Sequence, residues 1–180
     1  MEKKFELTDK FVFNTFGIKL FQIKCTKSFK YAKEGDLGGY VEKDENLDQE
    51  SDAWVYGNAQ VSGNAQVSGD AWVSGNARVS GNAQVSGDAW VSGDTQVSGD
   101  ADIENDNNHC GFDCFGSCNR HTHAYLTKDN KVEITCGCFR GSIEEFEKKV
   151  EKTHSGTIYE KQYKAIINVI KIKFGLTDLI

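Results

Sequence analysis

The side chains best suited to chemistry lie close together in the last third of the chain. His109, His121 and His123 share this segment with five thiols, those of Cys110, Cys114, Cys118, Cys136 and Cys138. Zinc prefers four thiolate or imidazole ligands in a tetrahedron, and the segment supplies enough of both. The first three cysteines are separated by fours, however, which is not the spacing of two paired zinc knuckles. A structural zinc site is therefore one hypothesis for this segment.

Packing is the interpretation that we favour for the thiols. Cys136 and Cys138 are two residues apart around Gly137, so both would face the same side of a regular strand as a small apolar pair. A regulatory disulfide is a third alternative. Nucleophilic catalysis by cysteine and histidine is disfavoured, because no nucleophile elbow and no known triad order is present. We expect a protein that is not an enzyme and that requires no cofactor.

Two glycines and two arginines suggest a phosphate cradle near the same segment. Gly137 and Gly141 precede a predicted helix start at Ser142, with Arg120 and Arg140 close in the sequence. Backbone N–H groups at a glycine-rich turn and a helix start bind phosphate readily. The simpler interpretation, a turn followed by a helix cap, is the one we favour.

The elements that must position these residues begin with a repeat. Residues 51–104 fall into nine hexads: SDAWVY, GNAQVS, GNAQVS, GDAWVS, GNARVS, GNAQVS, GDAWVS, GDTQVS and GDADIE. In each hexad a small residue and a branched aliphatic residue are two apart and point inward, and a turn of the Ser-Gly-Asn type follows. Three short strands and three corners close a coil of 18 residues. The sequence therefore predicts a mainly β protein built on a triangular β-solenoid of the left-handed type.

Three tryptophans support the period of 18. Trp54, Trp72 and Trp90 occupy the outward slot of every third hexad, so they should stack on one face, while Arg78 lies on the second face. Such a column exceeds the apolar area that monomers usually expose. We expect a second subunit, the C-terminal module of the chain or a foreign protein to cover it, unless the stacked column is simply exposed.

The solenoid needs caps at both ends, because open strand edges aggregate. Residues 1–50 predict a β-hairpin cap and an imperfect first coil that enters the hexad register at Asn46 and Leu47. Residues 105–180 predict a hairpin of HAYLT and VEITC, then helices over about 143–154 and 158–174, a ββαα module.

The charge distribution excludes several partners. Residues 45–106 carry 11 acidic residues, Asp70 and Asp88 among them, and 1 basic residue. Direct nucleic-acid binding by this segment is disfavoured, because phosphates need a basic surface. The sequence also shows no signal peptide and no apolar run of membrane-spanning length, so we expect a cytoplasmic protein that does not contact a membrane.

The solenoid resembles the left-handed β-helix of certain acyltransferases and of one carbonic anhydrase class. Those enzymes use histidines that project from the coils, and no histidine occurs between Ser51 and Glu104. The enzymatic function therefore does not follow from the fold.

Longer segments resemble a family of small phage and prophage β-helix proteins. The matching pieces are GDLGGYVEKDENL, the GNAxVS and GDAxVS repeats, and CGCFRGSIEEFEKKVEKTH followed by YEKQY. Members of the family often carry an unbroken Gly-Ser-Arg before the hairpin, whereas this chain has Gly116, Ser117, Cys118, Asn119 and Arg120. The resemblance implies a phage origin and no established chemistry.

The leading hypothesis is a phage-encoded, oligomeric inhibitor of the counter-defence or anti-CRISPR type. It would occupy a basic surface of a host protein, such as a defence nuclease, in the host cytoplasm. Its interface would use residues of the acidic solenoid, namely Trp54, Trp72, Trp90, Asp70, Asp88 and Arg78. The first alternative is a sponge for a small phosphorylated signalling ligand, with Ser117, Arg120 and Arg140 as ligand residues. The second alternative is a structural or assembly protein that uses the solenoid as a spacer.

Overall fold

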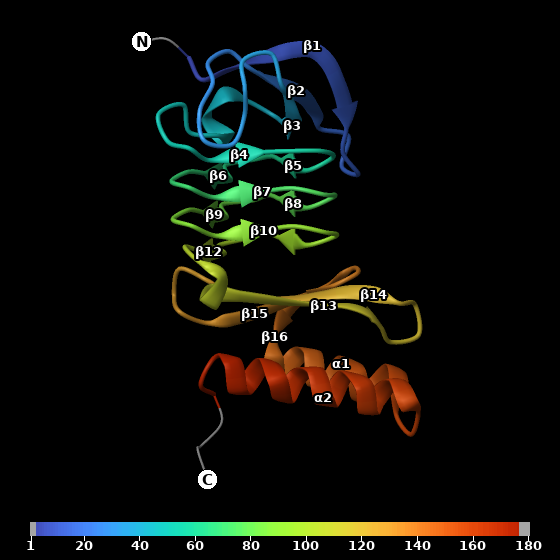
Figure 1. Cartoon of the computed structure of the whole chain (residues 1–180). Helices are drawn as coiled ribbons and strands as arrows, with labels where there is room; N and C mark the ends of the chain where they lie inside the picture. Colours follow the sequence, from blue (N-terminus) through green and yellow to red (C-terminus); the bar gives the residue numbers. More distant parts are fainter. Residues whose placement is uncertain (1–2, 177–180) are drawn as a thin grey trace. The chain divides into compact units, whose positions relative to one another are not determined.

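The computed structural model describes residues 3–176, which form two compact units (Figure 1). The first unit ends at Asn108 and the second begins at His109. Among the described residues, no helix is long and apolar enough to cross a membrane.

The first unit is built around stacked coils of 18 residues, as the repeat predicts (Figure 1). Each hexad contributes one two-residue strand: β4 (Trp54–Val55), β5 (Gln60–Val61), β6 (Gln66–Val67), β7 (Trp72–Val73), β8 (Arg78–Val79), β9 (Gln84–Val85), β10 (Trp90–Val91), β11 (Gln96–Val97) and β12 (Asp102–Ile103). These strands pair in parallel with the strand 18 residues away, which gives the ladders β4-β7-β10, β5-β8-β11 and β6-β9-β12. The prediction of a β-solenoid is confirmed.

A dry axis of small and branched side chains fills the coils. The Val and Ala side chains that the hexads send inward are buried, and Ile103 ends one column. Each fully buried Val stabilises the fold by about 1.5–3 kcal/mol. Two of the three corners carry side-chain ladders: Asn76 donates to Asp94 at 2.9 Å, and Asn82 donates to Asp100 at 3.1 Å. The third corner carries Asp in every coil.

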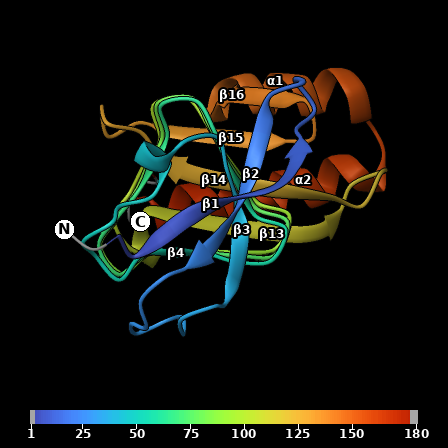
Figure 2. The same ribbon diagram turned by 90° about the horizontal axis from the view of Figure 1, so that it is seen from above.

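A sheet extension caps the first coil. Strands β1 (Phe5–Phe13) and β2 (Lys19–Cys25) form an antiparallel hairpin, and β3 (Leu37–Val41) pairs with both β2 and the solenoid strand β5. Figure 2 looks down on this hairpin, which crosses over the coils of the same unit. Gly38 and Gly39 allow the close approach, because a Cβ there would lie 2.6 Å from Val55 O and 2.7 Å from Ala59 O, respectively.

An imperfect coil continues the cap, as its sequence predicts. The short 3-10 helix η1 (Asp44–Asn46) is followed by Leu47, which bridges to Val67 of the solenoid. The buried Asn46 amide donates to the carbonyls of Gly63 and Ala65 at 3.1 and 2.8 Å. Lys4 donates to the carbonyls of Ser51 and Ala53 at 2.6 and 2.8 Å, so polar groups at the end of the solenoid are satisfied within the chain.

The second unit has a four-stranded antiparallel sheet and two helices, not the two strands of the predicted ββαα module. Its strands are β13 (His109–Phe115), β14 (Arg120–Leu126), β15 (Val132–Cys136) and β16 (Phe139–Ser142), in that spatial order. The predicted hairpin is β14–β15. The strand β16 (FRGS) was missed because it shows no apolar alternation, whereas β13 was missed although Cys110 and Phe112 alternate and pack against the core. The helices are α1 (Ile143–His154) and α2 (Ile158–Lys173), close to the predicted bounds. The short 3-10 helix η2 (Asp106–Asn108) belongs to the first unit.

Candidate functional site

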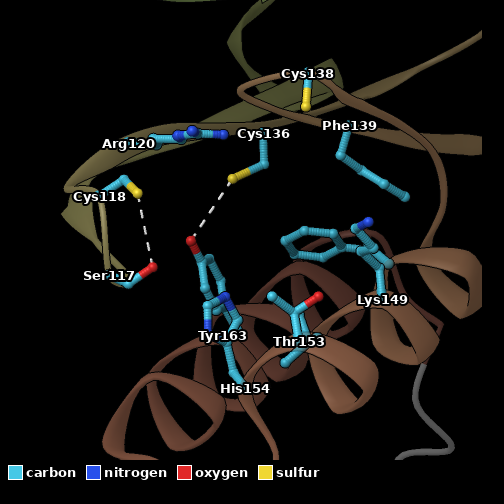
Figure 3. Close-up of a pocket in the computed structure, with 12 residues that line it drawn as sticks. Ser117, Cys118, Arg120, Cys136, Cys138, Phe139, Lys149, Thr153, His154 and Tyr163 are labelled. Carbon is cyan, nitrogen blue, oxygen red and sulfur yellow. Dashed lines mark hydrogen bonds between the residues drawn. The ribbon is translucent and has the colours of Figure 1, made fainter.

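The second unit contains a cavity of about 200 Å³ (Figure 3). Four elements or turns supply its walls: the β13–β14 turn, the β15–β16 turn, α1 and α2. The lining residues are Ser117, Cys118, Arg120, Cys136, Cys138, Phe139, Phe146, Lys149, Val150, Thr153, His154 and Tyr163. The sequence analysis had identified several of these residues separately, and the structure brings them around one cavity.

Backbone contacts fix the β13–β14 turn over the cavity. Gly116 has a φ of 73°, and an added Cβ there would overlap the hydroxyl of Tyr163, so only glycine fits. The Gly116 N–H donates to Gln162 Oε1 at 3.0 Å, which ties the turn to α2. Ser142 and Glu145 form a capping box that starts α1, the helix that carries Lys149. The first of these contacts fixes the turn next to Ser117, and the second fixes the start of α1.

Aromatic rings form the apolar floor. Phe146 contacts Phe139 at 5.0 Å and Tyr163 at 5.6 Å between ring centroids. His154 stacks on Tyr163 at 5.5 Å with an interplanar angle of 29°. Apart from His154, these rings belong to or pack against the hydrophobic core of this unit, which includes Val150, Ile166 and Ile170. The floor is therefore rigid and suited to an apolar ligand body.

Positive charge and hydrogen-bond donors surround this floor. Arg120 and Lys149 line the cavity, and the side chain of neither makes a hydrogen bond or ion pair with any residue from 3 to 176. The residues that line the cavity in the described part of the chain include no carboxylate. Burial, and secondarily the neighbouring Cys136, raises the pKa of Tyr163 to about 12, so its hydroxyl keeps its proton at neutral pH and acts as a donor. The site therefore favours an anion.

The start of α1 is a turn followed by a helix cap, which is the interpretation favoured from the sequence, and the alternative of a phosphate cradle is not supported. Arg140 is outside the cavity lining and forms an ion pair with Glu133, with Nη2 3.1 Å from Oε2. The capping position is already filled, because Ser142 N–H donates to Glu145 Oε2 at 2.9 Å. A Cβ on Gly141 would overlap that same carboxylate, so no space is left for a phosphate there. Of the three candidate ligand residues, Ser117 and Arg120 line the cavity and Arg140 does not.

The structure does not support the zinc hypothesis. Among residues 3–176, no group of three or more His, Cys, Asp or Glu side chains is placed to hold a metal ion. The reason is that the thiols point to different surroundings: Cys136 is buried in the core, Cys110 packs against that core, and Cys114, Cys118 and Cys138 are exposed. Burial raises the pKa of Cys110 to about 11, so it is a neutral thiol at pH 7.

We predict that thiol reactivity divides the six cysteines into two sets. Iodoacetamide should modify Cys114, Cys118 and Cys138 in the native protein, because these residues are exposed. Cys25, Cys110 and Cys136 should react only after unfolding, because burial shields them and raises the pKa of Cys25 and Cys110. Mass spectrometry of the alkylated peptides measures the pattern. If all five C-terminal cysteines were protected from alkylation, and a chelator abolished that protection, the zinc hypothesis would be restored.

The tryptophan column forms, but its three members differ in exposure. The indoles of Trp54, Trp72 and Trp90 stand in parallel register on β4, β7 and β10. Trp54 is 0% exposed and Trp90 is 59% exposed. The cover comes from the N-terminal cap, which was not among the predicted covers: Phe29 contacts Trp54 at 5.3 Å.

The charged residues proposed for the same interface do not share one surface. Asp70 and Asp88 lie at the corner that precedes the tryptophan strands, and Asp70 pairs with Lys30 at 3.0 Å. Arg78 lies on β8, in a different ladder from the tryptophans. The predicted interface of six residues is therefore divided between two faces, and part of it is occupied by the chain itself.

A second hollow, of about 570 Å³, lies in the first unit beside the cap. Lys3 and Lys4 line it, but Lys3 pairs with Asp44 at 2.6 Å and Lys4 donates to two backbone carbonyls. Its lining also includes the carboxylates of Glu50 and Asp52. Because its cations are already engaged, it is a weaker anion site than the cavity of the second unit.

What sequence reasoning missed was the helical wall of the cavity. Lys149 and Thr153 are four residues apart on α1, so they lie on one face of that helix together with Phe146. The segment CGCFRGSIEEFEKKVEKTH, which carries the family resemblance, contains this helical spacing, and together they could have indicated the site. The segment contributes eight of the lining residues: Cys136, Cys138, Phe139, Phe146, Lys149, Val150, Thr153 and His154.

The coils are similar to a known repeat family. Residues 59–75, 71–84 and 83–99 match the model of the YdcK beta solenoid repeat. No curated protein matches the chain. The matched residues belong to the solenoid alone, so the comparison supports the β-helix repeat and extends neither to the N-terminal cap nor to the cavity of the second unit.

Proposed function

We propose that the protein binds a small organic anion in the cavity of its second unit and does not transform it. The observation that supports this proposal most is the pair of cations, Arg120 and Lys149, that line an aromatic cavity without a carboxylate partner. Both side chains are solvent-exposed, so each stays hydrated when the cavity is empty and is free to turn its charge toward an anionic ligand. The proposal corresponds to the sponge hypothesis of the sequence analysis.

A phosphate monoester fits these groups best. Arginine binds phosphate in a bidentate manner, lysine contributes a point charge, and the hydroxyls of Ser117 and Thr153 supply further donors. The rings of Phe146 and Tyr163 offer a face to the body of the ligand. A volume of about 200 Å³ holds a phosphoryl group with a small ring or sugar, and not a complete dinucleotide.

We propose binding without turnover because the described lining residues include no carboxylate that could act as a general base. Hydrolysis of a phosphate ester needs a metal ion, a nucleophile or a general base. Tyr163 is protonated at neutral pH, and the described lining residues offer no Asp or Glu as base. His154 stacks on Tyr163, and the thiols of Cys118 and Cys138 also line the cavity, so release of inorganic phosphate from phenyl phosphate is the outcome that would contradict binding without turnover. A phage protein that sequesters a phosphorylated signal in the host cytoplasm would act in counter-defence by mass action alone.

Calorimetric titration of the full chain with phenyl phosphate tests the proposal. We expect saturable binding that Arg120→Gln weakens by about 10- to 100-fold, because a hydrogen bond to a charged group contributes about 1.5–3 kcal/mol. Arg140→Gln is the matched control, since it removes the same charge outside the cavity and should leave the dissociation constant unchanged. Bound phenyl phosphate should also slow the alkylation of Cys118 and Cys138, which line the cavity.

Three further ligands define the chemistry that is recognised. Inorganic phosphate should bind more weakly than phenyl phosphate, because it leaves the ring floor empty. Comparing the affinities of benzoate and phenyl phosphate shows whether the site prefers a carboxylate or a phosphoryl group. Phenol, which has the ring and no charge, should not bind. Equal affinities for phenol and phenyl phosphate, or equal losses in Arg120→Gln and Arg140→Gln, would refute an anion site.

Inhibition of a host protein is a second proposal, and the exposed Trp90 favours it. The hypothesis of a phage origin rests only on the sequence resemblance, and the hypothesis of an oligomer rests only on the area of the tryptophan column. The cap covers Trp54, which reduces the surface that a partner could use. Any such partner would therefore bind at the third coil, where Trp90 and Asp88 lie.

A further inference from the structure

One short motif recurs at the same place in three successive coils. Asp-Ala-Trp stands at residues 52–54, 70–72 and 88–90, at intervals of 18. In each copy the Asp lies at a corner and the Trp points outward from the next strand. Because parallel pairing repeats at about 4.8 Å, the three copies present nearly the same surface at three heights.

The chain itself covers the first two copies with one loop segment, Phe29–Lys30–Tyr31. Phe29 contacts the indole of Trp54 edge-on at 5.3 Å and 67°, and Tyr31 contacts Trp72 at 5.0 Å and 68°. Lys30, between these rings, pairs with the carboxylate of Asp70 at 3.0 Å.

The backbone of the second copy also takes part, since the Tyr31 hydroxyl donates to the carbonyl of Asp70 at 3.2 Å. The structure thus shows what this surface binds: a segment that alternates aromatic and basic side chains.

The third copy lacks such a cover. Trp90 is 59% exposed, although its neighbour Trp72 lies only 6.3 Å away between ring centroids. Asp88 is exposed, and its carboxylate makes no hydrogen bond or ion pair within residues 3–176. The surrounding coils add negative charge, with 11 acidic residues and 1 basic residue in residues 45–106.

We propose that Trp90 and Asp88 form a docking site for a partner protein segment in which an aromatic residue adjoins a lysine or arginine. The aromatic ring packs edge-on against Trp90, as Tyr31 does on Trp72, and the cation pairs with Asp88, as Lys30 does with Asp70. The site is independent of the anion cavity in the second unit, so either proposal can fail alone.

Two observations favour a foreign protein segment with aromatic and basic side chains: the acidic surface around the site, and the engagement of the chain's own loop at the first two copies. Nucleic acid is repelled, because its phosphates would meet the carboxylates of Asp70 and Asp88. A second copy of the chain cannot offer this same segment, since Phe29, Lys30 and Tyr31 are already engaged. A foreign segment would add a ring contact and an ion pair beside an existing aromatic cluster. Aromatic residues and arginine often supply most of the binding energy at protein interfaces.

The peptide KSFKYAK, which copies residues 27–33, is the probe. When it is titrated into the full chain at low salt, the indole N–H resonance of Trp90 should shift in a saturable manner. Trp90→Ala should weaken binding by about 10-fold and Asp88→Asn by about 2- to 5-fold, the latter in the range of exposed ion pairs. Added salt should weaken binding of the wild-type protein and have little further effect on Asp88→Asn.

Matched controls separate the site from general charge. Asp102→Asn removes the same charge in another ladder and should leave the peptide affinity unchanged. The peptide ESFEYAE, with the charge reversed, and KSAKAAK, without the rings, should not bind. Unchanged affinity in Trp90→Ala would overturn the proposal. The proposal would also be overturned if the wild-type protein sedimented as a dimer and Trp90→Ala as a monomer, because the occupant of the site would then be a second copy.

Discussion

Val73→Asp should leave the first unit largely unfolded at 25 °C, whereas Gln66→Lys should change its stability by less than about 0.5 kcal/mol. Val73 is 0% exposed on the solenoid axis, between Val55 and Val91 of the adjacent coils. A carboxylate there meets only apolar neighbours and loses its hydration without a partner, which costs several kcal/mol of a total stability of about 5–15 kcal/mol. Gln66 points outward from β6, so a lysine reaches solvent freely.

Tryptophan fluorescence makes this measurement specific to one unit. All three tryptophans of the chain lie in the solenoid, at positions 54, 72 and 90, so the emission during urea unfolding reports the first unit alone. Val73→Asp should show the emission of solvated indole without denaturant. Indistinguishable urea midpoints for the wild type and Val73→Asp would mean that position 73 does not face a dry axis.

The solenoid could be predicted from sequence because its information is periodic and local. Each hexad specifies one strand and one corner, and the recurrence of Trp at intervals of 18 determines the number of hexads in a coil. The helix α1 was equally accessible, since Ser142 and Glu145 mark its start by a capping box. In both cases the residues that decide the structure lie within a few positions of each other.

The cavity could not be predicted as a unit, because it depends on contacts between distant segments. Arg120 and Lys149 are separated by 29 positions. They come from different elements, the strand β14 and the helix α1, and line the same cavity only in the folded unit. The strand β16 has four residues, and its pairing with β15 decides which side of the turn faces α1. Sequence spacing left a phosphate site near Arg140 open as an alternative, and the ion pair with Glu133 that argues against it depends on the sheet register.

Identical sequences with different surroundings set a further limit. The hexads at residues 69–74 and 87–92 both read GDAWVS, yet Trp72 is partly covered and Trp90 is 59% exposed. Two rings cover Trp72: Tyr31, from a loop some 40 positions earlier in the chain, and Tyr56, whose place is taken by Ser74 one coil later. A repeat predicts its own geometry, but which copy is available to a partner depends on the elements outside it.

The same difference predicts that Trp54→Ala and Trp90→Ala have very different effects on stability. Trp54 is 0% exposed and contacts Phe5 and Phe29 at 6.5 and 5.3 Å between ring centroids, so its removal leaves a cavity between the cap and the first coil. We expect a loss of about 3–5 kcal/mol, in the range of large buried aromatic residues. Trp90 is 59% exposed, so we expect a loss of less than about 1 kcal/mol.

Urea unfolding followed by the fluorescence of the two remaining tryptophans compares these variants directly. Trp54→Phe is the conservative control, since it keeps a ring against Phe29 and should recover part of the loss. Destabilisation by Trp90→Ala as large as that by Trp54→Ala would mean that the third copy is covered in solution, and the docking site would then be closed. A small effect of both substitutions would mean instead that the cap does not pack on the first coil, because only that packing distinguishes the buried indole from the exposed one.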